Sequence, residues 1–154
     1  MSKLPKLPKS KLRPPPGFKK AKVEDFQADI QRLGEDIAEE FKERVIGNIE
    51  SNRFGYLLAP DTIKRKGSDT PLIDSGELIA AIYRDETTVS VEDTPRGDTQ
   101  CTNLGLAIIQ EYGTKDLHVP ARPVWRETFR EFKRTAHKDV ISFLETTKFK
   151  KSRK

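Results

Sequence analysis

Cysteine is almost absent from this sequence: Cys101 is the only one in 154 residues. A single cysteine excludes an internal disulfide, and its sparing use suits a reducing compartment. The N-terminus has no apolar block of signal-peptide length, and no apolar run approaches the length of a membrane span. The sequence therefore predicts a soluble protein that is made in a cytoplasm and has no membrane partner.

The residue patterns of the common enzyme classes are also missing. The chain has no glycine-rich phosphate loop and no Cys/His cluster for zinc. Its two histidines, His118 and His137, are 19 residues apart, which is more typical of surface or structural histidines than of catalytic ones. Acid pairs such as Glu39-Glu40 are adjacent in sequence, so their side chains diverge on a helix or strand. We therefore predict no enzymatic activity, no cofactor and no metal.

Positive charge is concentrated at the two ends of the chain. Residues 1–20 carry seven lysines and arginines and residues 148–154 carry five, with no acid in either segment. The segment between them, 21–147, keeps 17 basic residues against all 24 acidic ones, a net charge of −7. The formal charge of +5 therefore describes an acidic domain between two basic tails. We divide the chain into an arm at 1–20, a single domain at 21–147 and a tail at 148–154.

The arm has five prolines among its 20 residues. This density blocks helix and favours polyproline II, which has three residues per turn. In the stretch KLPKLP, that period places Leu4 and Leu7 on one edge and lysines on another. Two interpretations stay open: a solvated linker in the free protein, and an arm that docks its leucine edge and its lysines on an acidic neighbour. The tail residues assigned to such contacts are Leu4, Leu7, Lys3, Lys6, Lys9 and Arg13 in the arm, with Lys150 and Lys151 at the other end.

Apolar periodicity predicts a long amphipathic helix from Val23 to about Asn48. Its apolar stripe recurs every three or four residues and is expected to form core. Gly34 interrupts the stripe, which is tolerable where another element packs close. The members of the stripe are Phe26, Ile30, Leu33, Ile37, Phe41, Val45 and Ile49.

Shorter elements are predicted in the middle of the domain. Ser51–Pro71 is rich in turn-forming residues and is expected to form turns. In PLIDSGEL, Asp74 lies three residues before Glu77, a spacing like that of a capping box that opens a short helix or turn.

Two short strands and a short helix should follow. AAIYRDE and TVSVE predict strands with Ile82, Val89 and Val91 facing a core. The polar loop 93–100 is expected to be exposed. NLGLAIIQEYG predicts a short apolar helix or strand that stops at Gly113, and of the two we favour a helix.

A second long amphipathic helix, out to Glu145, is predicted to close the domain. Its apolar face is formed by Val124, Trp125, Thr128, Phe129, Phe132, Ala136, Val140, Phe143 and Leu144. Pro123 suits its first position, where a missing N–H costs little, and Arg122 precedes a proline and is expected to be extended. The prolines of VPARP thus set the angle at which the chain enters the helix. The predicted fold is α+β: a small, mainly antiparallel sheet packed with two long amphipathic helices, plus an extended N-terminal arm and a short basic C-terminal tail. The aromatic residues expected in the core are Phe41, Trp125, Phe129 and Phe132.

Three motifs occur in order along the domain: PLIDSGEL (Pro71–Leu78), AIIQEYG (Ala107–Gly113) and PARP (Pro120–Pro123). In this order and spacing they resemble the phage virion-morphogenesis and tail-completion proteins, a family that includes head–tail joining and tail-terminator subunits of long-tailed phages. The resemblance covers roughly residues 24–145. The positions of the motifs that we single out as structural are Asp74, Gly76, Gly113, Pro120, Arg122 and Pro123.

The chain departs from the family pattern in its arm and in the second motif. Ile109 stands where the family often has histidine, and an extra Glu111 separates Gln110 from Tyr112. For this reason we assign no individual role to Gln110. The basic, proline-rich arm is outside the pattern, so its role must be argued from its own chemistry.

The resemblance implies a non-enzymatic subunit of a ring, typically six-fold, between the capsid connector and the tail. Such a ring has neighbouring neck and tail proteins as partners, lies in the virion after assembly in the host cytoplasm, and lets DNA pass through its lumen. We expect acidic charge along the lumen and basic tails that hold adjacent rings. We also expect Arg122 to make a bidentate contact with a carboxylate, through two of its guanidinium N–H groups, within the subunit or across the interface; the alternative is a surface residue at a helix start.

The basic tails also allow a nucleic-acid-binding accessory protein, acting through phosphate contacts. Only Phe18 and Phe149 offer aromatic stacking in or next to the tails, and the domain itself is acidic. We therefore favour a homo-oligomer in which each acidic domain receives a neighbour's basic arm.

Overall fold

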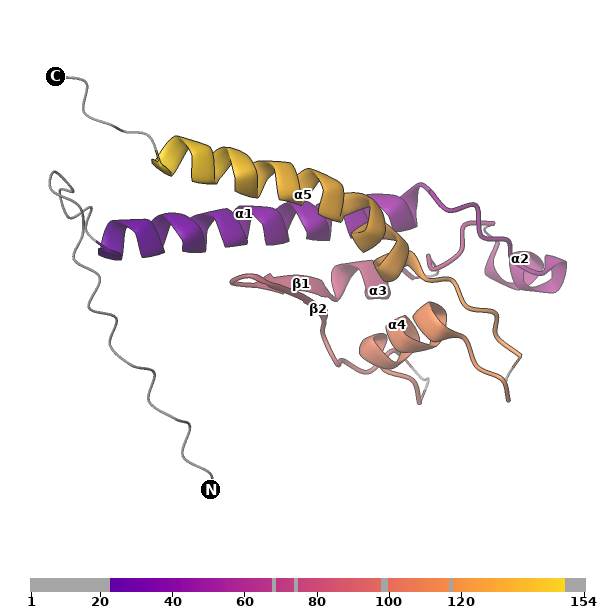
Figure 1. Ribbon diagram of the computed structural model, residues 1–154. Helices are drawn as coiled ribbons and strands as arrows, with labels where there is room; N and C mark the ends of the chain where they lie inside the picture. The colour runs from indigo at the N-terminus through magenta and orange to yellow at the C-terminus, as the bar shows by residue number, and fades with distance from the viewer. Residues whose placement is uncertain (1–22, 68, 74, 98–99, 117, 149–154) are drawn as a thin grey trace, which may run out of the picture.

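The computed structural model describes residues 23–67, 69–73, 75–97, 100–116 and 118–148. Its elements confirm the predicted α+β fold, with one antiparallel pair of strands and two long helices (Figure 1). The elements are α1 (Val23–Glu50), α2 (Pro60–Lys66), α3 (Glu77–Ala80), β1 (Ile82–Asp85), β2 (Thr88–Val91), α4 (Asn103–Tyr112) and α5 (Val124–Lys148). The residues of interest outside the described ranges are Lys3, Leu4, Lys6, Leu7, Lys9, Arg13, Asp74, Lys150 and Lys151.

Helix α1 is the middle layer of the fold. Helix α5 packs along it, and both strands of the hairpin contact it as well (Figure 1). Helix α4 contacts α3, β2 and α5, so it closes the end of the domain where α5 begins. Among the described residues, no helix is both long enough and apolar enough to cross a membrane.

The hairpin has the predicted strands and the predicted inward face. Ile82 is opposite Val91 in the register, and both are buried, while Val89 packs against the core from a partly buried position. The turn of the hairpin approaches α1 at Gly34. A Cβ on Gly34 would lie 2.7 Å from Cγ2 of Thr87, so the glycine makes room for the hairpin, as its place in the helix predicted.

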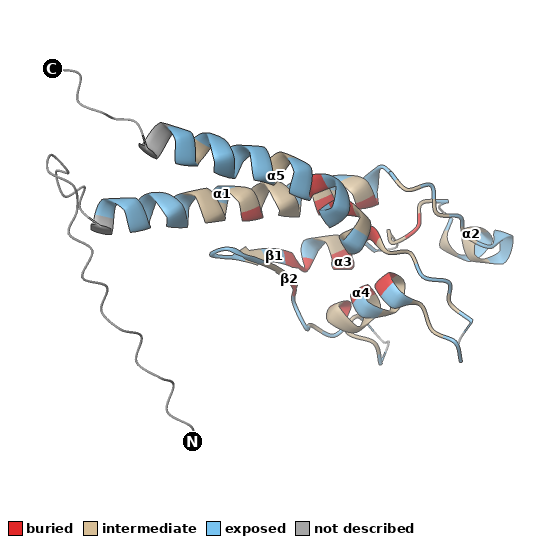
Figure 2. Cartoon of the chain, viewed as in Figure 1, coloured by how far each residue is buried: buried red, intermediate tan, exposed pale blue. Residues whose placement is uncertain are grey.

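The core lies where α1, α3, the hairpin, α4 and the start of α5 meet (Figure 2). Its apolar residues come from the C-terminal half of α1 rather than from the whole predicted stripe. A polar contact joins the two long helices beside it: Asn48 Nδ2 donates to Oγ1 of the buried Thr128 at 2.8 Å. The core cluster is Val45, Ile49, Leu78, Ala81, Ile82, Val91, Ala107 and Val124.

The aromatic residues expected in the core do not all lie there. Phe132 is 2% exposed, as predicted, whereas Phe41 and Trp125 are half-buried. Phe129 is 57% exposed, so its predicted burial is wrong. Its ring meets that of Phe41 edge-on at 6.0 Å, but no described element covers its other side.

The predicted apolar stripes also extend beyond the core. Phe26 and Ile30 in α1 are exposed, as are Val140 and Leu144 in α5. The hairpin turn reaches α1 at Gly34, and nearer the start of α1 no described element adds a further layer. Among the described elements, the long helices there pack on each other, with the rings of Phe26 and Phe143 6.3 Å apart.

Three helix starts differ from the sequence-based expectation. The segment predicted as turns contains α2, which begins at Pro60 and ends before Gly67 in the left-handed conformation. The residue that precedes α3 is Gly76, with φ 82° and no side-chain cap, so the predicted capping box does not form the helix start. Helix α5 begins at Val124, one residue after the expected Pro123, whose carbonyl accepts from the Glu127 N–H at 3.1 Å.

Candidate functional site: the corner between α4 and α5

The glycine that ends α4 has a conformation and a setting that exclude other residues. The N–H of Gly113 donates to the carbonyl of Ile109 at 2.7 Å, as expected for the predicted stop of the helix. Gly113 has φ 71° and ψ 179°, a region that is essentially restricted to glycine. A Cβ there would also lie 2.7 Å from the carbonyl oxygen of Val119 and 2.8 Å from the nitrogen of Ala121. The chain therefore needs glycine here for two independent reasons.

The loop after Gly113 folds back and ties the Pro-Ala-Arg-Pro segment to α4. Thr114 donates its N–H to the carbonyl of Val119 at 2.9 Å. The N–H of Arg122 then reaches the carbonyl of Gln110 at 2.5 Å. The two prolines have no N–H to donate, and of the two residues between them Arg122 supplies the main-chain N–H that ties the segment to α4.

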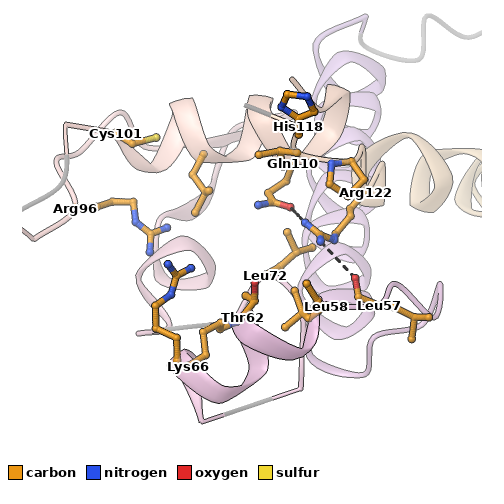
Figure 3. A pocket seen from close by; sticks show the side chains of 15 residues that line it. Leu57, Leu58, Thr62, Lys66, Leu72, Arg96, Cys101, Gln110, His118 and Arg122 are labelled. Atoms are coloured by element: carbon orange, nitrogen blue, oxygen red, sulfur yellow. Dashed lines mark hydrogen bonds between the residues drawn. The ribbon is translucent and has the colours of Figure 1, made fainter. Parts of the chain in front are cut away.

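The side chain of Arg122 adds two contacts to this backbone bond. Nη1 donates to Oε1 of Gln110 at 3.0 Å, and Nη2 lies 3.4 Å from the carbonyl oxygen of Leu57, in the loop before α2 (Figure 3). Both acceptors are neutral. The predicted carboxylate contact is therefore wrong within the described part of the chain, because a glutamine and a main-chain carbonyl occupy the reach of the guanidinium group. A carboxylate across an interface stays a prediction.

Glu111 caps the start of α5 from the end of α4. It is 8% exposed, and its Oε2 accepts from the N–H of Trp125 at 3.0 Å, while its Oε1 accepts from the N–H of Arg126 at 3.1 Å. The first N–H groups of a helix have no partner inside the helix, and the positive end of the helix dipole favours an anion there. One carboxylate from a different element thus satisfies two of these donors.

Arg126 completes the corner. Its Nε lies 3.3 Å from Oε1 of Glu111, and its Nη2 donates to the main-chain carbonyl of the same residue at 3.2 Å. Its guanidinium carbon also lies 5.4 Å from the ring centre of Tyr112. The side chain of Arg126 is half-exposed, so we expect the ion pair to fix orientation more than to add stability.

The charged groups of this corner also shift the pKa of the Tyr56 phenol. Burial raises the pKa of Tyr56 above its ordinary value, and the negative charges of Glu127 and Glu111 raise it further. The backbone of Tyr56 is held by Asn52, whose Oδ1 accepts from the Tyr56 N–H at 3.0 Å. The phenol therefore stays neutral well into the alkaline range.

A cavity of about 550 Å³ opens beside the Pro-Ala-Arg-Pro segment, towards α2 (Figure 3). Two of its basic side chains have contacts in the fold: Arg96 Nε lies 3.6 Å from Oε2 of Glu77, and Lys66 Nζ donates to the carbonyl of Thr70 at 3.0 Å. We interpret these two contacts as links that join α2 and α3 to the loops beside them. The described residues include no group of three or more His, Cys, Asp or Glu that could hold a metal ion. The polar side chains of the lining are Thr62, Arg65, Lys66, Arg96, Cys101, Gln110, His118 and Arg122.

The structure brings together part of the set that the sequence singled out. Gly113, Pro120, Arg122 and Pro123 form the corner, and Gly76 lies apart from it, before α3. Both histidines are exposed, in keeping with the surface role expected of them.

Sequence reasoning missed Glu111 and left Gln110 without a role. A signal for Glu111 was present: a lone acid within an apolar helix, close in sequence to the start of another helix. Such an acid can cap the first N–H groups of a helix, but the sequence does not show that the chain turns back and brings the start of α5 to Glu111.

Comparison of the chain with protein-family models, with curated proteins and with solved structures finds no match.

Proposed function

We propose that this chain is a non-enzymatic structural subunit of a phage neck or tail-completion ring, where it joins the capsid connector to the tail as a tail terminator or a head–tail joining protein. The three motifs of the sequence point to this class of protein. The proposal includes a homo-oligomer, six-fold in the family that the motifs resemble, with other neck and tail proteins as neighbours.

The observation that supports a role as a subunit is the number of large apolar side chains that are exposed to solvent. Leu57, Tyr112, Phe129 and Ile108 are all more than half exposed, although they are large and apolar. Apolar surface that gathers into patches marks sites of association between proteins. Ile108 and Tyr112 lie together on one groove, which gives the association a defined location.

The corner between α4 and α5 supports a role that needs a rigid subunit. Gly113, Glu111 and Arg122 fix the direction of α5 through main-chain, carboxylate and guanidinium contacts. A ring subunit must repeat the same angle at every interface, and a corner braced by several bonds suits that requirement. On this proposal, Pro-Ala-Arg-Pro is a rigid structural link between α4 and the last helix, not an active site.

Electron microscopy of lysates from a phage that lacks this gene tests the proposal. Filled capsids beside finished but unattached tails indicate a joining or completion role, and tails of uncontrolled length indicate a terminator. Intact, infectious particles would overturn the virion role.

The basic tails favour a second candidate, a nucleic-acid-binding accessory protein. Together they carry 12 positive charges, enough for binding to phosphates that weakens as salt rises. Removal of residues 1–20 and 148–154 should then abolish nucleic-acid binding while the domain stays folded. If the truncated chain still binds nucleic acid but no longer assembles, this second candidate fails.

A further inference from the structure

We propose that the groove between β2, α4 and the start of α5 is the docking site for the N-terminal arm of a second copy of this chain, with Leu4 and Leu7 as the inserted side chains. The inference rests on the homo-oligomer of the proposed function and names the contact between its copies, which can be measured on the purified protein. It stands or falls independently of any role in a virion.

The groove is apolar and open. It has a volume of about 240 Å³, and Ile108 on its wall is 51% exposed and Tyr112 70% exposed. Large apolar side chains at this exposure, gathered around one hollow, offer burial to an apolar partner. The groove is lined by Val89, Ser90, Val91, Leu104, Ala107, Ile108, Glu111, Tyr112 and Trp125.

Two aromatic side chains, Trp125 and Tyr112, line the groove, and each contacts another side chain of the fold. The ring of Trp125 lies 6.2 Å from that of Phe41, and the ring of Tyr112 lies under the guanidinium group of Arg126. Grooves with aromatic walls bind proline-rich segments, because polyproline II is already extended before binding and loses little entropy. The sequence KLPKLP, with proline at every third position, is such a segment.

The arm also has the right charge for this domain. Residues 1–20 contribute seven positive charges and no acid, whereas segment 21–147 has a net charge of −7. Glu92 and Asp93 are exposed and follow directly on Val91 of the groove, so they are placed to receive lysines of the arm. With Leu4 and Leu7 in the groove, the polyproline II period leaves the lysines on a different edge, free to meet these acids.

The same charges favour a second copy as the source of the arm. Two acidic domains that approach each other repel, and a basic arm that crosses from one to the other offsets this repulsion. An arm of 20 residues in polyproline II spans about 60 Å, which is ample for a crossing between neighbours.

Cross-linking of two full-length variants tests the proposal. One chain carries Cys101→Ser and Leu7→Cys, and the other carries Cys101→Ser and Ile108→Cys. The control partner replaces Ile108→Cys by His137→Cys, at an exposed position on α5 three turns beyond Trp125. The two chains are mixed, oxidised and separated without reductant.

Docking raises the effective concentration of the two thiols to the millimolar range, so we expect at least about tenfold more cross-linked heterodimer with Ile108→Cys than with His137→Cys. Equal cross-linking in the two mixtures overturns the proposal. A single chain can also carry both Leu7→Cys and Ile108→Cys. If its disulfide forms only within one chain, the exchange of arms between copies is overturned.

A second measurement does not depend on disulfides. Leu4 and Leu7 belong to the basic arm, so their replacement by serine should reduce the oligomer mass measured by light scattering while the far-UV circular dichroism of the domain stays unchanged. Ile108→Asp should give the same reduction, and the combined variant should give no further one. Unchanged mass in the arm variant argues against the proposal, and additive losses would show that arm and groove act separately.

Discussion

Glu111 caps the helix that contains Trp125: its Oε2 accepts the Trp125 N–H at 3.0 Å from the end of the preceding helix. The cap comes from the preceding helix rather than from the residue next to the helix start. It ties the angle between α4 and α5 to one buried carboxylate. The charge and the geometry of that carboxylate can be separated by mutation.

Glu111→Gln should lower the free energy of unfolding by about 1–2 kcal/mol, because the amide keeps the shape but loses the negative charge and one acceptor at the helix start. Glu131→Gln is the control, since Glu131 is an exposed acid later in α5, 3.7 Å from Arg53. Urea unfolding measures both. Equal losses of unfolding free energy in the two variants would mean that the contacts of Glu111 with the helix start do not stabilise the fold.

Gly113→Ala should destabilise the fold more than Gly67→Ala does. Both glycines have positive φ, but nothing lies within 4 Å of a Cβ at Gly67, whereas a Cβ at Gly113 meets the main chain at 2.7 Å. We expect Gly67→Ala to cost about 1 kcal/mol for the left-handed conformation, and Gly113→Ala to cost at least about 3 kcal/mol because strain and overlap add. Thermal unfolding of the two variants makes the comparison. Similar losses of stability in the two variants would show that the loop at Val119 moves to make room for the new methyl group.

Gly34→Ala should be at least about 1 kcal/mol less stable than Gly47→Ala, although both replace a glycine in α1. At Gly47 a Cβ has open space, so alanine should stabilise the helix, whereas at Gly34 it overlaps Cγ2 of Thr87. Adding Thr87→Ser removes that methyl group and should restore most of the difference. Urea unfolding of the three variants is the measurement, and a Gly34→Ala chain as stable as Gly47→Ala would contradict the close packing of the hairpin turn.

Truncation of the aromatic residues to alanine should rank them by burial. Phe132→Ala should cost about 3–5 kcal/mol, and Trp125→Ala less, about 2 kcal/mol, because its ring is only half-buried. Phe129→Ala should cost under about 1 kcal/mol in the monomer. Unfolding at low protein concentration gives the ranking. A Phe129→Ala loss as large as that of Phe132→Ala would place Phe129 in the core after all.

The raised pKa of Tyr56 predicts that the folded protein loses stability at high pH. Its pKa is raised in the folded state, so the folded protein holds the phenolic proton more tightly than the unfolded chain does. That contribution is complete below the unfolded pKa of about 10 and is lost as pH rises from there through the folded pKa. Tyr56→Phe cannot ionise, so between pH 9 and 11 its urea midpoint should fall less than that of the parent chain. Parallel midpoints across this range would contradict the raised pKa.

The extent of the sequence prediction can be followed element by element. The spacing of apolar residues predicted both long helices and the hairpin because a period of 3.6 or 2 is a local property. Gly113 as the end of α4 was also predictable, since the conformation that it needs excludes other residues. Helix α2 was missed, although Pro60 at its start and Gly67 after its end were signals for it.

What the sequence by itself determined about this protein is the separation of an acidic segment, 21–147, from two basic ends, the type of its main elements, and the glycine at which α4 stops. Only the tertiary structure decided which apolar side chains are buried. Phe129 and Phe132 belong to the same predicted helix face, yet only Phe132 is covered. Only the fold brought Glu111 to the start of α5, because that contact depends on a loop that turns the chain back on itself. Local periodicity says which way a side chain can face, and burial depends on whether another element arrives on that side.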